Sequence, residues 1–159
     1  MPEYGIILNN EMDDFAARPG EPNAFGLIQS EANAVEPGKK PLSSMSPTIL
    51  IRDGKAVYAA GASGGPRIIN GTFQVLLNMV RHDQLPQPAV ATPRLHHQWQ
   101  PHTLFLEEPL LSAAGPTLEQ RGHRISRRDG VGNVQAVSRV DGALYGGSDP
   151  RKGGMPAGY

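Results

Sequence analysis

The region that most constrains the fold is residues 48–81, where two strand-like runs lead through a glycine-rich turn into an amphipathic helix. The runs TILIR and KAVYAA flank Asp53-Gly54, a dipeptide that favours the tight turn of a β-hairpin. Apolar side chains then recur at helical spacing over residues 67–81, and the preceding Pro66 suits a first helical turn. This region therefore predicts a hairpin over residues 48–60 and a helix over residues 67–81.

Weaker patterns surround this region. The apolar run YGIILN at residues 4–9 predicts a buried strand, whereas residues 16–47, rich in Pro, Gly, Asn and Ser, predict a long irregular segment. Further along, the sequence predicts an extended segment over residues 82–103, a strand over 104–107, a short helix over 117–121 and a second hairpin made of residues 133–140 and 143–145. This order favours an α+β fold with antiparallel pairs and no βαβ alternation.

The composition indicates a piece of a larger fold. Glycine and proline supply 34 of the 159 residues, and hydrophobic residues are 38% of the chain, below the usual range of about 45–50%. Such a chain is short of the apolar material that a self-sufficient core needs. We therefore expect residues 1–159 to form a single incomplete domain.

Charge and hydropathy exclude several functions. The 15 basic residues balance the 15 acidic ones, so the chain lacks the basic surface of a general nucleic-acid binder. The apolar runs are far shorter than the roughly 20 residues that span a bilayer, and residues 1–15 carry acids where a signal peptide carries positive charge. The absence of cysteine excludes disulfides and cysteine-ligated metals.

Three clusters could bind a charged ligand, and each also has a structural interpretation. Gly64 and Gly65 lie between a predicted strand and a predicted helix, where backbone N–H groups suit an anion or oxyanion, or they form a tight turn without a ligand. Ser43 and Ser44 could donate to a carboxylate or belong to a serine-rich loop. The acids near Glu11 and Asp14 could hold a cation or form a solvated turn.

The histidines indicate structure rather than a metal site. His96 and His97 are adjacent, so their side chains diverge on a strand, and only His97 and His102 could converge.

Seven segments in this order resemble one family, the γ-glutamyltranspeptidases (glutathione hydrolases), in the C-terminal part of their small subunit. The matching segments are LNNEMDDF (8–15), PNAFGL (22–27), ANAV (32–35), PLSSMSPT (41–48), GASGGPRII (61–69), PRLHHQW (93–99) and YGGSDPR (145–151), together with the closing Ala-Gly-Tyr.

The resemblance implies a partial N-terminal-nucleophile hydrolase fold, with four α/β/β/α layers and mostly antiparallel sheets. It implies a proenzyme that cleaves itself into large and small subunits, and a threonine that attacks γ-glutamyl amides such as glutathione. It also implies an acyl-enzyme that passes to water or to an amino acid, with no cofactor and no metal. Family members are commonly periplasmic or extracellular; the sequence itself gives no localisation.

The resemblance also assigns site residues. Glu11 and Asp14 would hold the α-ammonium of the γ-glutamyl group, Ser43 and Ser44 its α-carboxylate, and Gly64 and Gly65 the oxyanion. The nucleophilic threonine would lie upstream of residue 1 and an arginine of the pocket would belong to the large subunit, so we expect the chain alone to be inactive. Two alternatives stay open: an acylase of the cephalosporin (glutaryl) type from the same superfamily, and a non-catalytic remnant that binds amino acids.

Overall fold

The computed structural model describes residues 2–158, which form two compact units divided after Ser44. The second unit contains a four-stranded antiparallel sheet in the order β1-β2-β6-β7, formed by β1 (Thr48–Arg52), β2 (Lys55–Ser63), β6 (Asn133–Val140) and β7 (Ala143–Ser148). The Asp-Gly pairs at 53–54 and 141–142 all have positive φ, as a tight hairpin turn requires. Both predicted hairpins are confirmed, and β2 and β7 each run three residues further than the sequence indicates.

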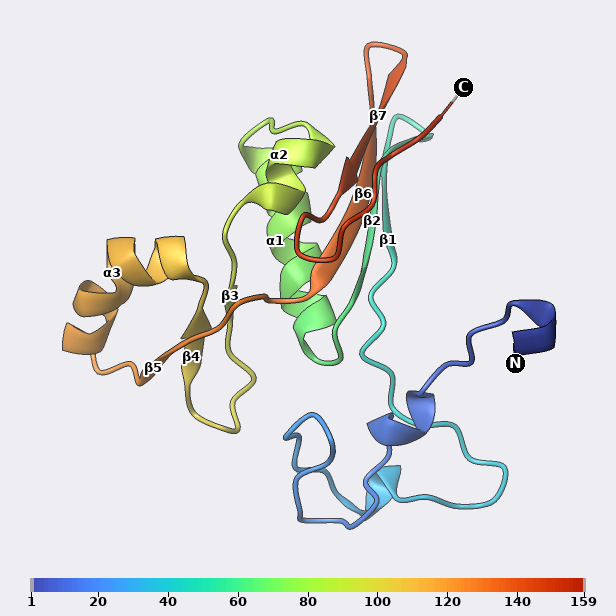
Figure 1. Cartoon of the computed structure of the whole chain (residues 1–159), viewed down its shortest axis with the longest axis vertical. Helices are drawn as coiled ribbons and strands as arrows, with labels where there is room; N and C mark the ends of the chain where they lie inside the picture. The colour runs from blue at the N-terminus through green and yellow to red at the C-terminus, as the bar shows by residue number, and fades with distance from the viewer. Residues whose placement is uncertain (1, 159) are drawn as a thin grey trace. The chain divides into compact units, whose positions relative to one another are not determined.

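Two helices cover one face of this sheet (Figure 1). Helix α1 (Arg67–Arg81) has the predicted bounds, and α2 (Pro86–Ala91) follows it. Alternate residues of β2 and β6 face these helices and close the core, which consists of Ala60, Val75, Met79, Ala89, Val90, Val134 and Ala136. The expectation of an extended segment over residues 82–103 is wrong for α2, since Pro86 occupies a first-turn position where its missing N–H costs nothing.

A smaller sheet contains β3 (Leu95–His96), β4 (Leu104–Leu106) and β5 (Ile125–Arg127). Helix α3 (Glu108–Gln120) connects β4 to β5, which lie parallel, so one βαβ unit is present where only antiparallel pairs were expected. The short helix expected over residues 117–121 is therefore the last part of a longer one. The sequence hid its extent because α3 passes through Pro116, a residue that ordinarily ends a helix.

The first unit has little regular structure. It contains the 3₁₀ turns η1 (Pro2–Tyr4), η2 (Glu11–Asp14) and η3 (Glu31–Asn33) and two isolated bridges, one of which joins Ala16 to Ala34. Residues 16–47 are irregular as predicted. The buried strand predicted over residues 4–9 is wrong: within residues 2–158 this run belongs to neither sheet, and its side chains are exposed. Within the same range, no helix combines the length and apolar character needed to cross a bilayer.

Candidate functional site

The acidic cluster forms the short turn η2. The side chain of Asn9 accepts the N–H of Glu11 at 3.1 Å, and the carbonyl of Asn10 accepts the N–H of Asp13 at 3.0 Å, so the chain turns over between these residues. Phe15 and Ala16, which follow the turn directly, are buried. Asp14 is thereby held at the edge of the unit's small core, while Glu11 stays exposed.

The electrostatics of this turn favour a cation. Partial burial raises the pKa of Asp14 above its ordinary 3.8, and the negative charges of Glu11 and Asp13 raise it further. Three carboxylates within four residues repel one another. An ammonium group placed among them would relieve this repulsion.

The serine segment follows in the same unit. Ser43 is exposed and Ser44 is half-buried, and neither belongs to a helix or a strand. The N–H of Leu42, the residue before Ser43, donates to the side-chain oxygen of Asn33 at 2.8 Å. The same amide donates from its nitrogen to the carbonyl oxygen of Asp14, also at 2.8 Å. Asn33 therefore connects the acid turn to the start of the serine segment.

The glycine turn belongs to the second unit, between β2 and α1. Gly64 has φ 137° and Gly65 has φ 59°, both in the region that favours glycine. The carbonyl of Gly65 accepts the N–H of Ile68 at 3.0 Å and so begins α1. Within residues 2–158, no backbone carbonyl accepts the N–H of either glycine. These two N–H groups lie beside the positive end of a 15-residue helix, an arrangement that suits an anion.

Gly132, a third glycine, lies against this turn and was not identified from the sequence. A Cβ added to Gly64 would lie 3.0 Å from the Cα of Gly132, so the two backbones are in close contact. Gly132 itself has φ 67°, and a Cβ there would lie 3.1 Å from the carbonyl oxygen of Arg67. Neither position has room for a side chain.

Positive charge collects at the glycine turn. The Nζ of Lys152 donates to the hydroxyl of Ser63, the residue before Gly64, at 3.0 Å. Burial and the nearby Arg128 lower the pKa of Arg67, whose Nε lies 3.8 Å from where a Cβ of Gly64 would be. These cations add to the helix end in favouring negative charge at the turn.

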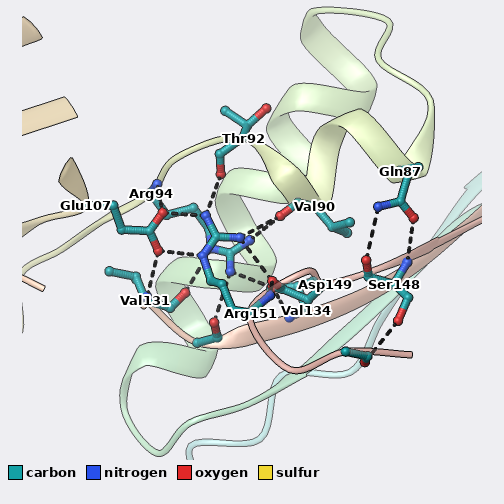
Figure 2. Close-up of polar contacts among 12 residues, drawn as sticks. Gln87, Val90, Thr92, Arg94, Glu107, Val131, Val134, Ser148, Asp149 and Arg151 are labelled. Atoms are coloured by element: carbon teal, nitrogen blue, oxygen red, sulfur yellow. Dashed lines mark hydrogen bonds and ion pairs between the residues drawn. The ribbon is translucent and has the colours of Figure 1, made fainter. Parts of the chain in front are cut away.

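Figure 2 shows a buried ion-pair network around Arg94 and Asp149. This network also holds Gly132, whose carbonyl accepts from Arg94. The guanidinium of Arg94, fully buried, donates to the carbonyls of Val90, Val131 and Gly132 at 2.8–2.9 Å and to the Asp149 carboxylate at 2.6 Å. Asp149 also accepts the N–H of Val134 at 2.7 Å. The network therefore fixes the entry to β6, where Gly132 meets Gly64.

Arg151 and Glu107 complete this network. Arg151 donates to Asp149 at 3.0 Å and forms a two-point ion pair with Glu107, which also accepts the backbone N–H of Arg94 and of Val131 at 2.9 Å (Figure 2). Burial alone would raise the pKa of Asp149, but hydrogen bonds from Val134, Arg151 and Arg94 lower it overall, so this carboxylate is ionised. Arg94 lies in the segment PRLHHQW and Asp149 and Arg151 in YGGSDPR, but the sequence indicated no role for them or for Glu107.

The histidines have structural partners, as the sequence indicated. His96 is buried, with one ring nitrogen 2.6 Å from the side-chain oxygen of Asn70 and the other 2.8 Å from that of Gln98. The rings of His97 and His102 do converge, edge to face at 5.2 Å. Residues 2–158 contain no group of three or more His, Asp or Glu side chains that could hold a metal ion.

The structure thus places the candidate residues in two groups. Glu11, Asp14, Ser43 and Ser44 lie in the first unit, where Asn33 joins the acid turn to the serine segment. Gly64 and Gly65 form an anion-suited turn in the second unit. The roles expected for these residues, an ammonium site, a carboxylate site and an oxyanion site, stay predictions.

Comparisons with known proteins agree on one family. The family model described as gamma-glutamyltranspeptidase matches residues 1–159. The chain is 44% identical to the glutathione hydrolase proenzyme of Escherichia coli over 159 residues, which is 99% of this chain and 27% of that protein. The chain therefore spans about a quarter of the length of this relative.

Solved structures give the same result. The structure is similar to a γ-glutamyltranspeptidase from Pseudomonas nitroreducens complexed with L-DON, with a TM-score of 0.89 and 40% identity, over 100% of this chain and 84% of that one. A more distant likeness is to a cephalosporin acylase from Bacillus halodurans, with a TM-score of 0.67 and 27% identity, over 75% of this chain and 23% of that one. The predicted α+β class with mostly antiparallel sheets, part of an N-terminal-nucleophile hydrolase fold, is confirmed.

Proposed function

The chain belongs to the γ-glutamyltranspeptidase family, and from this premise we propose that it supplies the substrate-binding and oxyanion-stabilising half of a site for γ-glutamyl transfer and hydrolysis. The substrate class is γ-glutamyl amides, with glutathione as the representative suggested by the names of its relatives. The observation that carries the proposal is the coexistence of an acid turn and a serine segment joined by one side chain, because an α-amino acid presents an ammonium and a carboxylate on one carbon atom.

The acid turn would hold the ammonium. Asp14 and Glu11 would accept its N–H groups, and the positive charge would offset the repulsion that raises the pKa of Asp14. A glutaryl group carries the same carboxylate but no ammonium, so it would leave the repulsion among the acids of the turn unrelieved. The turn therefore favours a γ-glutamyl over a glutaryl substrate.

The serine segment would hold the α-carboxylate. Ser43 and Ser44 offer two hydroxyl donors on consecutive residues outside any helix or strand. The hydrogen bond between Leu42 and Asn33 fixes the chain immediately before them. A carboxylate bound there would leave the γ-carbonyl of the substrate free to reach the reacting groups.

The glycine turn would stabilise the reaction intermediate. Attack on the γ-carbonyl carbon forms a bond from the nucleophile's oxygen to that carbon and places negative charge on the carbonyl oxygen. The N–H groups of Gly64 and Gly65 would donate to this oxygen, and the leaving amine takes a proton as the C–N bond breaks. Water or an amino acid would then attack the acyl-enzyme and regenerate the nucleophile.

The nucleophile and the remaining pocket residues would come from other parts of the protein. The relatives are proenzymes of which this chain matches about a quarter, and the family resemblance places a threonine nucleophile on the small subunit. The sheet face opposite α1 and α2 supports association with further protein. It carries the exposed side chains of Ile49, Ile51, Val137 and Leu144 and borders a groove of about 1140 Å³. On this basis, the isolated chain would bind a γ-glutamyl group but not turn it over.

A chimeric proenzyme tests the proposal. Residues 1–159 would replace the matching segment of the E. coli glutathione hydrolase proenzyme, and kcat/KM would be measured with γ-glutamyl and glutaryl p-nitroanilides. We expect a mature enzyme that prefers the γ-glutamyl compound, and Asp14→Ala should weaken that preference. Equal or better turnover of the glutaryl compound would favour the acylase alternative, which the likeness to a cephalosporin acylase supports.

Calorimetry separates the third possibility, a remnant that binds amino acids without catalysis. The 159-residue chain would be titrated with L-glutamate and with glutarate. Binding of L-glutamate by the chain, combined with a mature chimera that releases no p-nitroaniline from the γ-glutamyl compound, would identify such a remnant. Absence of L-glutamate binding in the chain would remove this alternative.

A further inference from the structure

Asn33 makes four hydrogen bonds that reach across the first unit. Its side-chain nitrogen donates to the carbonyl oxygen of Asp14 at 2.8 Å and to the side-chain oxygen of Gln29. Its side-chain oxygen accepts the N–H of Leu42 at 2.8 Å, and its own carbonyl accepts the N–H of Ala16 at 2.9 Å. The partners lie up to 19 residues away in the sequence, so these bonds fold distant segments onto one point.

Two of these contacts connect the proposed halves of a zwitterion pocket. The carbonyl of Asp14 belongs to the residue whose carboxylate would hold the ammonium, and the N–H of Leu42 immediately precedes Ser43. One planar amide therefore stands between the ammonium-binding turn and the carboxylate-binding segment. Because an amide has a donor and an acceptor at a fixed separation, it holds both backbones at a fixed distance.

The backbone around Asn33 restricts it further. Ala34 forms a bridge with Ala16, two residues after Asp14, and Asn33 ends the 3₁₀ turn η3. The side chain is half-buried, so its hydrogen bonds are partly shielded from competing water. The position of the amide is thus set by its own backbone and not by the ligand.

We propose that Asn33 is a positioning residue that sets the spacing between the ammonium and carboxylate sites, and so selects substrates that carry both groups on one carbon. This inference rests on the proposed function. Asn33 need not touch the substrate: it acts through Asp14 on one side and through Leu42 and Ser43 on the other. Its loss would leave each site able to bind its own charged group but would loosen their relative placement.

Three substrates measure this coupling in the chimeric proenzyme described above. The γ-glutamyl anilide carries both charged groups, the glutaryl anilide only the carboxylate, and the 4-aminobutanoyl anilide only the ammonium. In Asn33→Ala, all three side-chain hydrogen bonds are lost, including the two of roughly 1 kcal/mol each that connect the acid turn to the serine segment. We expect kcat/KM to fall about tenfold or more for the γ-glutamyl compound, mainly through KM, and less than about threefold for the two others.

Asn23→Ala is the matched control. The amide of Asn23 also donates to the acid turn, at the carbonyl of Asp13 at 3.3 Å, but its oxygen accepts from Phe25 and Leu27, close to Asn23 in the sequence, and not from Leu42. Any loosening of the acid turn in this variant should lower kcat/KM by the same factor for both substrates that carry an ammonium. A similar loss in Asn33→Ala for all three substrates, or no loss for any, would overturn the spacing role.

Different results would refute the proposed function and the role of Asn33. If the unmodified chimera shows no preference for the γ-glutamyl anilide, the proposed function fails whatever Asn33 does. If that preference is present and Asn33→Ala keeps it unchanged, only the inference about Asn33 fails.

If the Asn33→Ala chimera does not mature, the role of Asn33 can still be tested by hydrogen exchange in the 159-residue chain. The backbone N–H of Leu42 should exchange with deuterium about tenfold faster in Asn33→Ala than in the unmodified chain, because its hydrogen bond to Asn33 is lost. Equal exchange rates at Leu42 in the two proteins would show that the amide does not hold the serine segment, and would refute the proposal.

Discussion

Replacing Arg94 by methionine tests the buried network directly. Methionine retains much of the side-chain volume but removes every donor of the guanidinium. The carboxylate of Asp149 would keep its bonds from Val134 and Arg151 but lose a fully buried charged partner 2.6 Å away, and the carbonyls of Val131 and Gly132 would lose their donors. Removal of one member of a buried ion pair costs about 3–5 kcal/mol. Since small domains are stable by about 5–15 kcal/mol, this is a large share of the total.

Urea unfolding of the 159-residue chain measures the effect, with circular dichroism as the signal. The matched control is Arg127→Met, because Arg127 also pairs with two carboxylates, Glu108 at 3.3 Å and Asp129 at 3.2 Å, but its side chain is 61% exposed. Exposed pairs of this kind contribute at most about 1 kcal/mol. We therefore expect a marked fall in the unfolding midpoint for Arg94→Met and almost none for Arg127→Met.

The double variant Arg94→Met with Asp149→Leu completes the test. Because the charge left without its main partner is then also removed, the double variant should be more stable than the sum of the two single losses predicts. A cost below about 1 kcal/mol for Arg94→Met alone would refute the reasoning, since it would mean that Asp149 finds equivalent partners without Arg94.

Three further outcomes follow from other sites. In the chimeric enzyme, Gly64→Ala should slow acylation about a hundredfold, because a Cβ at φ 137° would displace an oxyanion donor. Gly61→Ala, where a Cβ meets nothing within 4 Å, should leave the acylation rate unchanged. Equal acylation rates for the two variants in stopped-flow kinetics would show that the turn plays no part. KM for the γ-glutamyl donor should rise as the pH falls through the pKa of Asp14, which burial and neighbouring acids raise above 3.8. Asp14→Asn should give a high KM at every pH. A KM independent of pH in the unmodified enzyme would contradict a role for Asp14 in binding the ammonium. Burial lowers the pKa of His96 below 6.5, so the folded chain should lose stability as the pH falls below 6.5. In urea unfolding at two pH values, His96→Gln should reduce this loss of stability, whereas His123→Gln should not. The same pH dependence in all three proteins would exclude His96 as its source.

Local signals in the sequence predicted the elements whose structure depends on local chemistry. The two Asp-Gly hairpins and helix α1 follow from turn propensity and helical spacing, and each has its predicted position. The run at residues 4–9 has the right side chains for a strand, but a strand also needs a partner. Helix α3 extends past Pro116, because contacts with β4 and β5 outweigh the local preference to end the helix there.

The candidate site residues also divide into those that local sequence indicates and those that depend on distant contacts. Glu11, Asp14, Ser43, Ser44 and the glycine pair were identified because their residue types indicate their chemistry, and their roles remain predictions. Asn33 was overlooked because an asparagine in an irregular segment is usually a turn residue, and its importance depends on partners 9 and 19 residues away. No local pattern distinguishes an asparagine that closes its own turn from one that joins two others.

The glycine turn shows how remote residues decide the usefulness of a local motif. Gly64 can adopt its backbone conformation by itself, but the direction of its N–H depends on what lies behind it, and that is the backbone of Gly132. The position of Gly132 depends in turn on the buried guanidinium of Arg94, 38 residues earlier in the chain. An oxyanion donor must be in place before charge develops, because a donor that moves during the reaction loses part of its stabilising effect. The buried ion pair, which is a costly way to gain stability, is therefore best understood as a means of holding the turn rigid.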